Sequence, residues 1–117
     1  IKAWRGSYTL DDFHCPCTFT DEALLARLLP AMEAVVGPEN LEGGAPMSGT
    51  EDFSYIAQAV PSVFVLLGAG GPDHCPHHNP RMVLEESVFW QGAALHAMCA
   101  MRYLQTAKET EKGREPA

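Results

Sequence analysis

Apolar residues recur at helical spacing in two long segments of the chain. The first spans residues 21 to 36 and gives a helix one apolar face: Leu25, Leu28, Leu29, Met32, Val35 and Val36. Thr20 is expected to cap this helix and Gly37-Pro38 to end it, while Pro30 removes a backbone donor and predicts a kink or a break. The second spans Glu85 to about Thr106 and leaves few polar positions, which predicts a substantially buried last helix.

Shorter patterns predict a small helix and a strand between these two segments. A capping serine or threonine within residues 48–50, followed by Glu51-Asp52, marks the start of a short helix that ends at Pro61. Ser62 to Leu67 is a continuous apolar run rich in β-branched and aromatic residues, which is typical of a central strand covered on both faces. Residues 1–10 and the surroundings of Leu41 are places for further short strands. The pattern predicts part of an α/β sandwich whose sheet is incomplete.

Composition and charge narrow the class of protein. At 117 residues, with 46% hydrophobic and 20% charged residues, the chain has the composition of one modest globular domain. A net charge of −7 with only 8 Lys and Arg argues against a nucleic-acid partner. No apolar run approaches the ~20 residues of a membrane-spanning helix. The four cysteines are expected to be free thiols in a reducing compartment, and the protein is therefore expected to be cytoplasmic.

A proline-rich loop at residues 72–80 concentrates metal-competent side chains directly after the predicted strand. It holds His74, Cys75, His77 and His78. Ligands of α/β proteins bind beyond the carboxyl ends of strands, and a catalytic zinc site takes three protein ligands and leaves one position open. Adjacent His77 and His78 rarely bind the same ion. From the residues alone, a metal site and a solvated loop are equally good interpretations.

Two other groups of residues allow more than one interpretation. His14, Cys15 and Cys17 would complete a small structural zinc site with the loop, but their spacing is not that of zinc modules. Glu51-Asp52 suits a helix N-terminus, and the preceding turn of Ser48, Gly49 and Thr50 is a candidate for binding a substrate carboxylate. The residues alone argue against the zinc site and favour the helix N-terminal role of Glu51-Asp52.

The order of several short motifs resembles the C-terminal end of metal-dependent amidohydrolases, in the hippurate hydrolase and indoleacetyl-amino-acid hydrolase branch of the aminoacylase and carboxypeptidase family. The motifs are Ser-Gly-Thr-Glu-Asp-Phe-Ser at 48–54, Val60-Pro61, Phe-Val-Leu-Leu-Gly at 64–68 and His-Asn-Pro-Arg at 78–81. The resemblance extends from about Cys15 to Leu104.

The resemblance implies a fold, a domain arrangement and site residues. The chain would be the C-terminal part of a three-layer α/β/α metallo-exopeptidase-like catalytic domain. Residues 1–10 would end a lid domain that forms homodimers, residues 11–106 would be the returning half of the catalytic domain, and residues 107–117 a disordered tail. His78, two places before the proline, would be a metal ligand, and Ser48, Gly49 and Thr50 would contact the substrate.

The implied reaction is hydrolysis of the amide bond of N-acyl amino acids or similar small amides, with zinc or manganese and two ions in the parent protein. This chain lacks the upstream His-x-Cys-Gly-His-Asp and paired-glutamate motifs, so it holds no catalytic residue and is expected to be inactive alone. Met82 also replaces the aromatic residue expected after Pro-Arg. The alternatives are a stand-alone His/Cys zinc-binding module and a non-enzymatic interaction piece.

Overall fold

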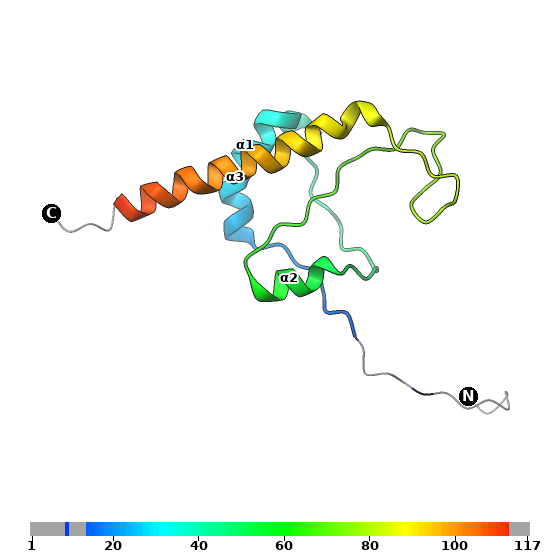
Figure 1. The fold of residues 1–117 in the computed structure, drawn as a ribbon, viewed down its shortest axis with the longest axis horizontal. Helices are drawn as coiled ribbons and strands as arrows, with labels where there is room; N and C mark the ends of the chain where they lie inside the picture. The colour runs from blue at the N-terminus through cyan, green and yellow to red at the C-terminus, as the bar shows by residue number, and fades with distance from the viewer. Residues whose placement is uncertain (1–8, 10–13, 113–117) are drawn as a thin grey trace.

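The computed structural model describes residue 9 and residues 14–112, and these form helices joined by long irregular connections. The order is α1 (Glu22–Val36), the 3-10 turn η1 (Pro38–Asn40), α2 (Phe53–Ala59), the 3-10 turn η2 (Glu86–Val88) and α3 (Phe89–Lys112) (Figure 1). The strand expected in residues 1–10 falls, apart from residue 9, outside the described residues. No strand forms around Leu41.

The ends of α1 follow from local side-chain chemistry. Asp21, not Thr20, is the N-cap, and its Oδ1 accepts a hydrogen bond from the backbone of Leu24 at 2.7 Å. Gly37 ends the helix with a φ of 84°, a conformation that favours glycine, and its amide donates to Glu33. The helix continues through Pro30 without the break that the sequence allowed.

The helices α1 and α3 pack against each other through small and flexible side chains and one arginine. Arg27 of α1 lies over the Tyr103 ring, with the guanidinium carbon 4.2 Å from the ring centre. The same guanidinium donates hydrogen bonds to Thr106 Oγ1 and, at 2.6 Å, to the Tyr103 carbonyl. Because Arg27 contacts both Tyr103 and Thr106 of α3, it sets the position at which the two helices meet.

Little apolar surface is buried within the described part of the chain. Four hydrophobic residues are buried there: Leu28, Ala31, Met32 and Ala57. Many larger ones are exposed, among them Trp90 at 61%, Met101 at 55% and Leu104 at 60% of α3. The prediction of a substantially buried last helix is therefore wrong for the described residues, because nothing among them covers most of the apolar surface of α3.

The segment Ser62–Leu67 is not a strand, which corrects the central strand of the predicted α/β fold. No strand occurs in residues 14–112, although the Ser62 carbonyl accepts from the Asp21 amide at 2.8 Å. Val65, Leu66 and Leu67 are exposed, and Leu67 lies against α3 where Gly92 leaves room for it. A strand is defined by repeated hydrogen bonds to a neighbouring segment, and apart from the one at Ser62 the described chain provides none for the backbone of residues 62–67.

The last helix extends further than its sequence pattern indicates. α3 ends at Lys112, so residues 107–112, which the sequence assigned to the tail, continue the helix. Residues 113–117 lie outside the described part. Among the helices described, none is long and apolar enough to cross a bilayer.

Candidate functional site

Residues 69–85, here called the histidine loop, form a closed excursion between the extended segment 62–67 and α3 (Figure 1). The Glu85 amide donates to the Ala69 carbonyl at 2.8 Å and closes the base of the loop. Nearer the tip of the loop, Cys75 and Met82 form an isolated β-type bridge that connects its two sides. The loop is therefore held by its own backbone and is not an open connection.

His78 has an unusual backbone at the tip of this loop. Its φ is 65°, the one positive value among the described non-glycine residues, and its side chain is exposed. Left-handed backbone is uncommon for a side-chain-bearing residue and occurs where the surroundings enforce it. The residue that the motif marks as a metal ligand is thus also the residue with the strained conformation.

The other candidate ligands of the loop do not converge on His78. His77 is exposed, and Cys75 is half-buried. The His74 ring lies against Gly71, and its buried Nδ1 has no hydrogen-bond partner. Within residues 14–112, no group of three or more His, Cys, Asp or Glu side chains is placed to hold a metal ion.

The arrangement required by the zinc-module alternative is therefore absent from the described chain. The segment of His14, Cys15 and Cys17 instead attaches to α2. Cys15 Sγ lies 3.1 Å from the fully buried Ser54 Oγ, and the carbonyls of His14 and Cys17 accept from Tyr55 (3.0 Å) and Gln58 (3.2 Å). These contacts connect residues 14–17 to α2, and none of them involves the histidine loop.

The predicted substrate-contacting residues lie in a separate irregular segment before α2. Ser48, Gly49 and Thr50 are exposed, and nothing lies within 4 Å of the position that a Gly49 side chain would take. Glu51 caps α2 in their place, because its carboxylate accepts from the Phe53 amide at 3.2 Å and its carbonyl from Ser54 at 3.0 Å. The structure does not bring this segment together with His78 by any hydrogen bond within the described chain.

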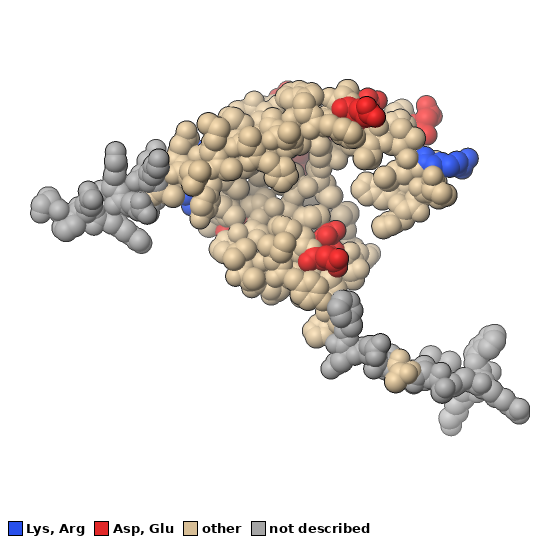
Figure 2. All heavy atoms as spheres, in the orientation of Figure 1, with Lys and Arg blue, Asp and Glu red and all other residues tan. Residues whose placement is uncertain are grey.

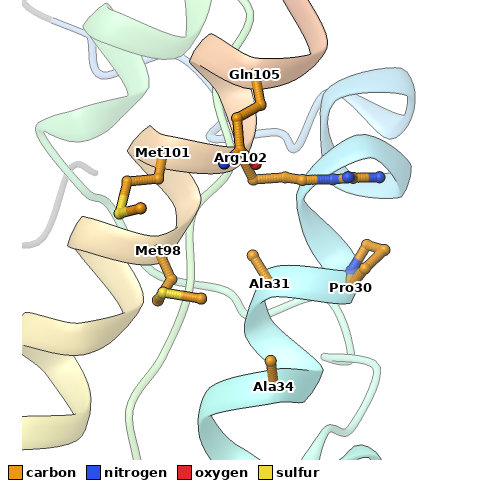
Figure 3. A pocket seen from close by; sticks show the side chains of 7 residues that line it. All are labelled: Pro30, Ala31, Ala34, Met98, Met101, Arg102 and Gln105. Carbon is orange, nitrogen blue, oxygen red and sulfur yellow. The ribbon is translucent and has the colours of Figure 1, made fainter.

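Two cavities lie on the helix pair, away from both predicted groups. The first, of about 200 Å³, separates α1 from α3 where Ala31 and Ala34 face Met98 and Met101 (Figure 3). The second, of about 540 Å³, is lined by both helices and by Val60-Pro61. Charged side chains are sparse on the face of the molecule shown in Figure 2. Neither cavity contains His78 or residues 48–50.

The described residues could supply one ligand to a metal ion but not a complete metal site. The exposed His78 imidazole makes no hydrogen bond within residues 14–112, so its nitrogens are available for coordination. A catalytic zinc ion takes about three protein ligands, and the remaining ones have no counterpart around this side chain. Sequence reasoning placed Glu51 at the start of a helix but missed the role of Asn79 in shaping the histidine loop. The signal for Asn79 was its position directly before a proline.

Comparison with known proteins gives consistent matches. A family model described as Peptidase family M20/M25/M40 matches residues 6–102. IAA-amino acid hydrolase ILR1-like 2 of Arabidopsis thaliana is 34% identical over 92 residues, which cover 77% of this chain and 21% of that protein. IAA-amino acid hydrolase ILR1-like 4 of the same plant is 34% identical over 96 residues, covering 80% and 22%.

A carboxypeptidase is a further relative. Thermostable carboxypeptidase 2 of Saccharolobus solfataricus is 31% identical over 87 residues, which cover 72% of this chain and 20% of that protein. The chain thus spans about a fifth of the length of these curated relatives. No solved structure shows a significant match.

Proposed function

The chain belongs to peptidase family M20/M25/M40, and from this premise we propose that it is the C-terminal part of a metal-dependent amidohydrolase. The proposed reaction is hydrolysis of the amide bond in N-acyl amino acids or similar small amides. The names of the relatives support this class, because both IAA-amino acid hydrolases and carboxypeptidases cleave a bond that releases an amino acid.

One structural observation carries the proposal: an exposed histidine with left-handed backbone at the tip of a closed loop. The resemblance marks this residue, His78, as a metal ligand, and the loop that presents it is fixed by its own hydrogen bonds. A φ of 65° is uncommon for a residue with a side chain, and such conformations cluster at functional sites. The conformation therefore favours a ligand over a passive surface residue.

In this proposal, the chain contributes one imidazole and part of the substrate pocket. His78 would hold one of two zinc or manganese ions, and such an ion polarises a substrate carbonyl when it is bound. Ser48, Gly49 and Thr50 would contact the carboxylate end of the substrate through hydroxyl and backbone donors. The remaining metal ligands and the general base would come from the preceding part of the catalytic domain.

The same proposal assigns a domain arrangement and a cellular location. Residues 1–10 would end a lid domain that forms the homodimer of the parent protein, and residues 11–106 would complete the catalytic domain. The parent protein would act in the cytoplasm, where its thiols stay reduced.

The proposal is tested by comparing the 117-residue chain with the complete enzyme. Both are assayed on a panel of N-acyl amino acids with added zinc or manganese. We expect turnover by the complete enzyme and none by the chain, because one histidine cannot hold a catalytic ion and no general base is present. Changing His78 to Ala in the complete enzyme is expected to reduce kcat/KM by about 10³-fold or more, since a metal ligand is lost.

A matched control is His77→Ala, which removes the neighbouring exposed histidine of the same loop. It is expected to leave activity within about threefold of the unchanged enzyme, because His77 has no proposed ligand role. Robust turnover by the isolated chain, or full activity of the His78 variant, would show the proposed function to be wrong.

A further inference from the structure

Asn79 connects two consecutive turns at the tip of the histidine loop. Its amide donates to the Pro76 carbonyl at 3.3 Å, which closes a turn that has His78 as its third residue. Its own carbonyl accepts from the Met82 amide at 3.0 Å, which closes the next turn. Asn79 is therefore the last residue of one turn and the first of the other.

The side chain of Asn79 adds a third bond that backbone alone could not make. Its Oδ1 accepts a hydrogen bond from the Arg81 amide at 2.9 Å. The side chain therefore forms an additional turn that spans Pro80. Asparagine at the first position and proline at the second are the residues that favour such a turn, because the Oδ1 mimics a backbone carbonyl and the proline fixes φ. The second turn is thus specified by Asn79-Pro80 itself.

The first turn has no comparable support from its own sequence. A turn with its third residue at positive φ normally has glycine or asparagine there, and this one has His78. Left to itself, residue 78 would relax to negative φ and turn its imidazole to another direction. The second turn prevents this relaxation by fixing the backbone of Asn79, the residue that immediately follows.

From this geometry we propose that Asn79 is a positioning residue: its side chain holds the left-handed backbone of His78 and thereby the direction of the imidazole. The expected effect on metal affinity rests on the proposed function. The structural part of the inference does not. The structural part concerns only the backbone of residues 76–82 and is measurable without any metal.

Three substitutions separate the hydrogen bond from the bulk of the side chain. Asn79→Leu keeps the size and removes the acceptor, Asn79→Asp keeps the acceptor, and Asn79→Ser supplies a weaker uncharged one. The matched control is Asn40→Leu, which removes another asparagine hydrogen bond, from Nδ2 to the Val36 carbonyl, far along the chain.

The first measurement uses the 117-residue chain without metal. NMR coupling constants report the φ of His78, and hydrogen exchange reports the Arg81 and Met82 amides. Leucine at position 79 is expected to move His78 to negative φ and to speed exchange of both amides by about two- to tenfold, the effect of one lost hydrogen bond. Asn79→Asp and Asn40→Leu should show the same φ and exchange rates as the unchanged chain. Asn79→Ser should show intermediate values. Unchanged φ and exchange in the leucine variant would overturn the inference.

The second measurement uses the complete enzyme and determines zinc affinity by competition with a chelating dye. Leucine at position 79 is expected to weaken affinity about 10- to 100-fold, as observed for residues that orient metal ligands, and serine to weaken it less. Aspartate is left out of this comparison because it adds a negative charge beside the ligand. The Asn40 variant should keep the parent affinity, which excludes a general loss of stability as the cause.

The His78→Ala enzyme makes the two possible failures distinguishable. If this variant keeps full zinc affinity, His78 is not a ligand and the proposed function fails. If it loses affinity while the leucine variant at position 79 keeps it, His78 is a ligand but Asn79 does not position it, and only the inference fails.

Discussion

At the residue scale, the left-handed backbone of His78 has an energetic cost as well as a geometric consequence. A Cβ atom in this conformation crowds the neighbouring carbonyl, which costs about 1–2 kcal/mol. The sequence marked His78 through its motif, but the motif carries no information on φ. Two turns surround the residue, and the second of them contains Asn79 and Pro80.

We predict that glycine at position 78 stabilises the loop relative to alanine. Both His78→Gly and His78→Ala remove the imidazole, but only alanine keeps the crowded Cβ, so the loop should be about 1 kcal/mol more stable with glycine. Hydrogen exchange of the Asn79 and Met82 amides measures this difference. Equal or slower exchange in the alanine variant would contradict a left-handed residue at this position.

A second residue-scale prediction concerns Cys99. Burial disfavours the thiolate and raises the pKa of the Cys99 thiol above its usual 9.0. At pH 8, less of Cys99 is therefore thiolate, and because its side chain is also less accessible, its alkylation should be slower than that of the exposed Cys17. Mass spectrometry after timed iodoacetamide treatment measures both rates. The Cys99 rate should keep rising as the pH increases past 9, and faster labelling of Cys99 at pH 8 would refute the prediction.

At the element scale, α1 formed where its sequence pattern placed it because a helix depends on near neighbours. Its apolar spacing, its terminal glycine and an acidic residue at its start all act within one or two turns. The choice between Thr20 and Asp21 as cap could not be made in this way. It depends on where the chain enters the helix, which the bond from the Asp21 amide to Ser62 fixes.

Removing the cap should weaken α1 measurably. Asp21→Ala deletes the acceptor of the Leu24 amide and is expected to destabilise the chain by about 1 kcal/mol. Asp52→Ala is the control, because Asp52 precedes α2 without making a side-chain cap bond and should cost no more than a few tenths of a kcal/mol. Urea unfolding followed by circular dichroism compares the two, and equal effects would argue against capping by Asp21.

The contact between α1 and α3 should depend strongly on Arg27. Replacing it by Met keeps much of the apolar stem but loses two hydrogen bonds and the stacking on Tyr103, an expected loss of about 1–3 kcal/mol. Arg27→Lys keeps the charge without the planar fork and should lie between. The same urea unfolding measures both variants. A lysine variant as stable as arginine would show that charge alone holds the helices.

At the scale of the whole molecule, the described chain exposes more large hydrophobic residues than it buries. The exposed side chains of the segment 62–67 and of α3 are those expected in the interior of an α/β domain. This distribution agrees with a chain that spans about a fifth of its relatives' length.

We predict that the isolated 117-residue chain binds the dye ANS and associates with itself as its concentration rises. Exposed apolar patches of this kind favour both behaviours. Fluorescence titration and sedimentation velocity measure them, with the complete enzyme as the control that should show neither. A monodisperse chain that leaves ANS fluorescence unchanged would mean that these apolar side chains are covered within the chain itself.

The sequence by itself determined the helices, the end of α1 and the family, because these depend on residues close together along the chain. Spacing, capping and short motifs are local, so they can be read without knowing what lies opposite. Only the tertiary structure decided that Ser62–Leu67 finds no strand partner among the described residues, that α3 stays largely exposed there and that His78 is left-handed. Each of these depends on segments meeting in space, because a strand needs a neighbouring backbone, burial needs a covering surface, and a strained backbone needs contacts that hold it.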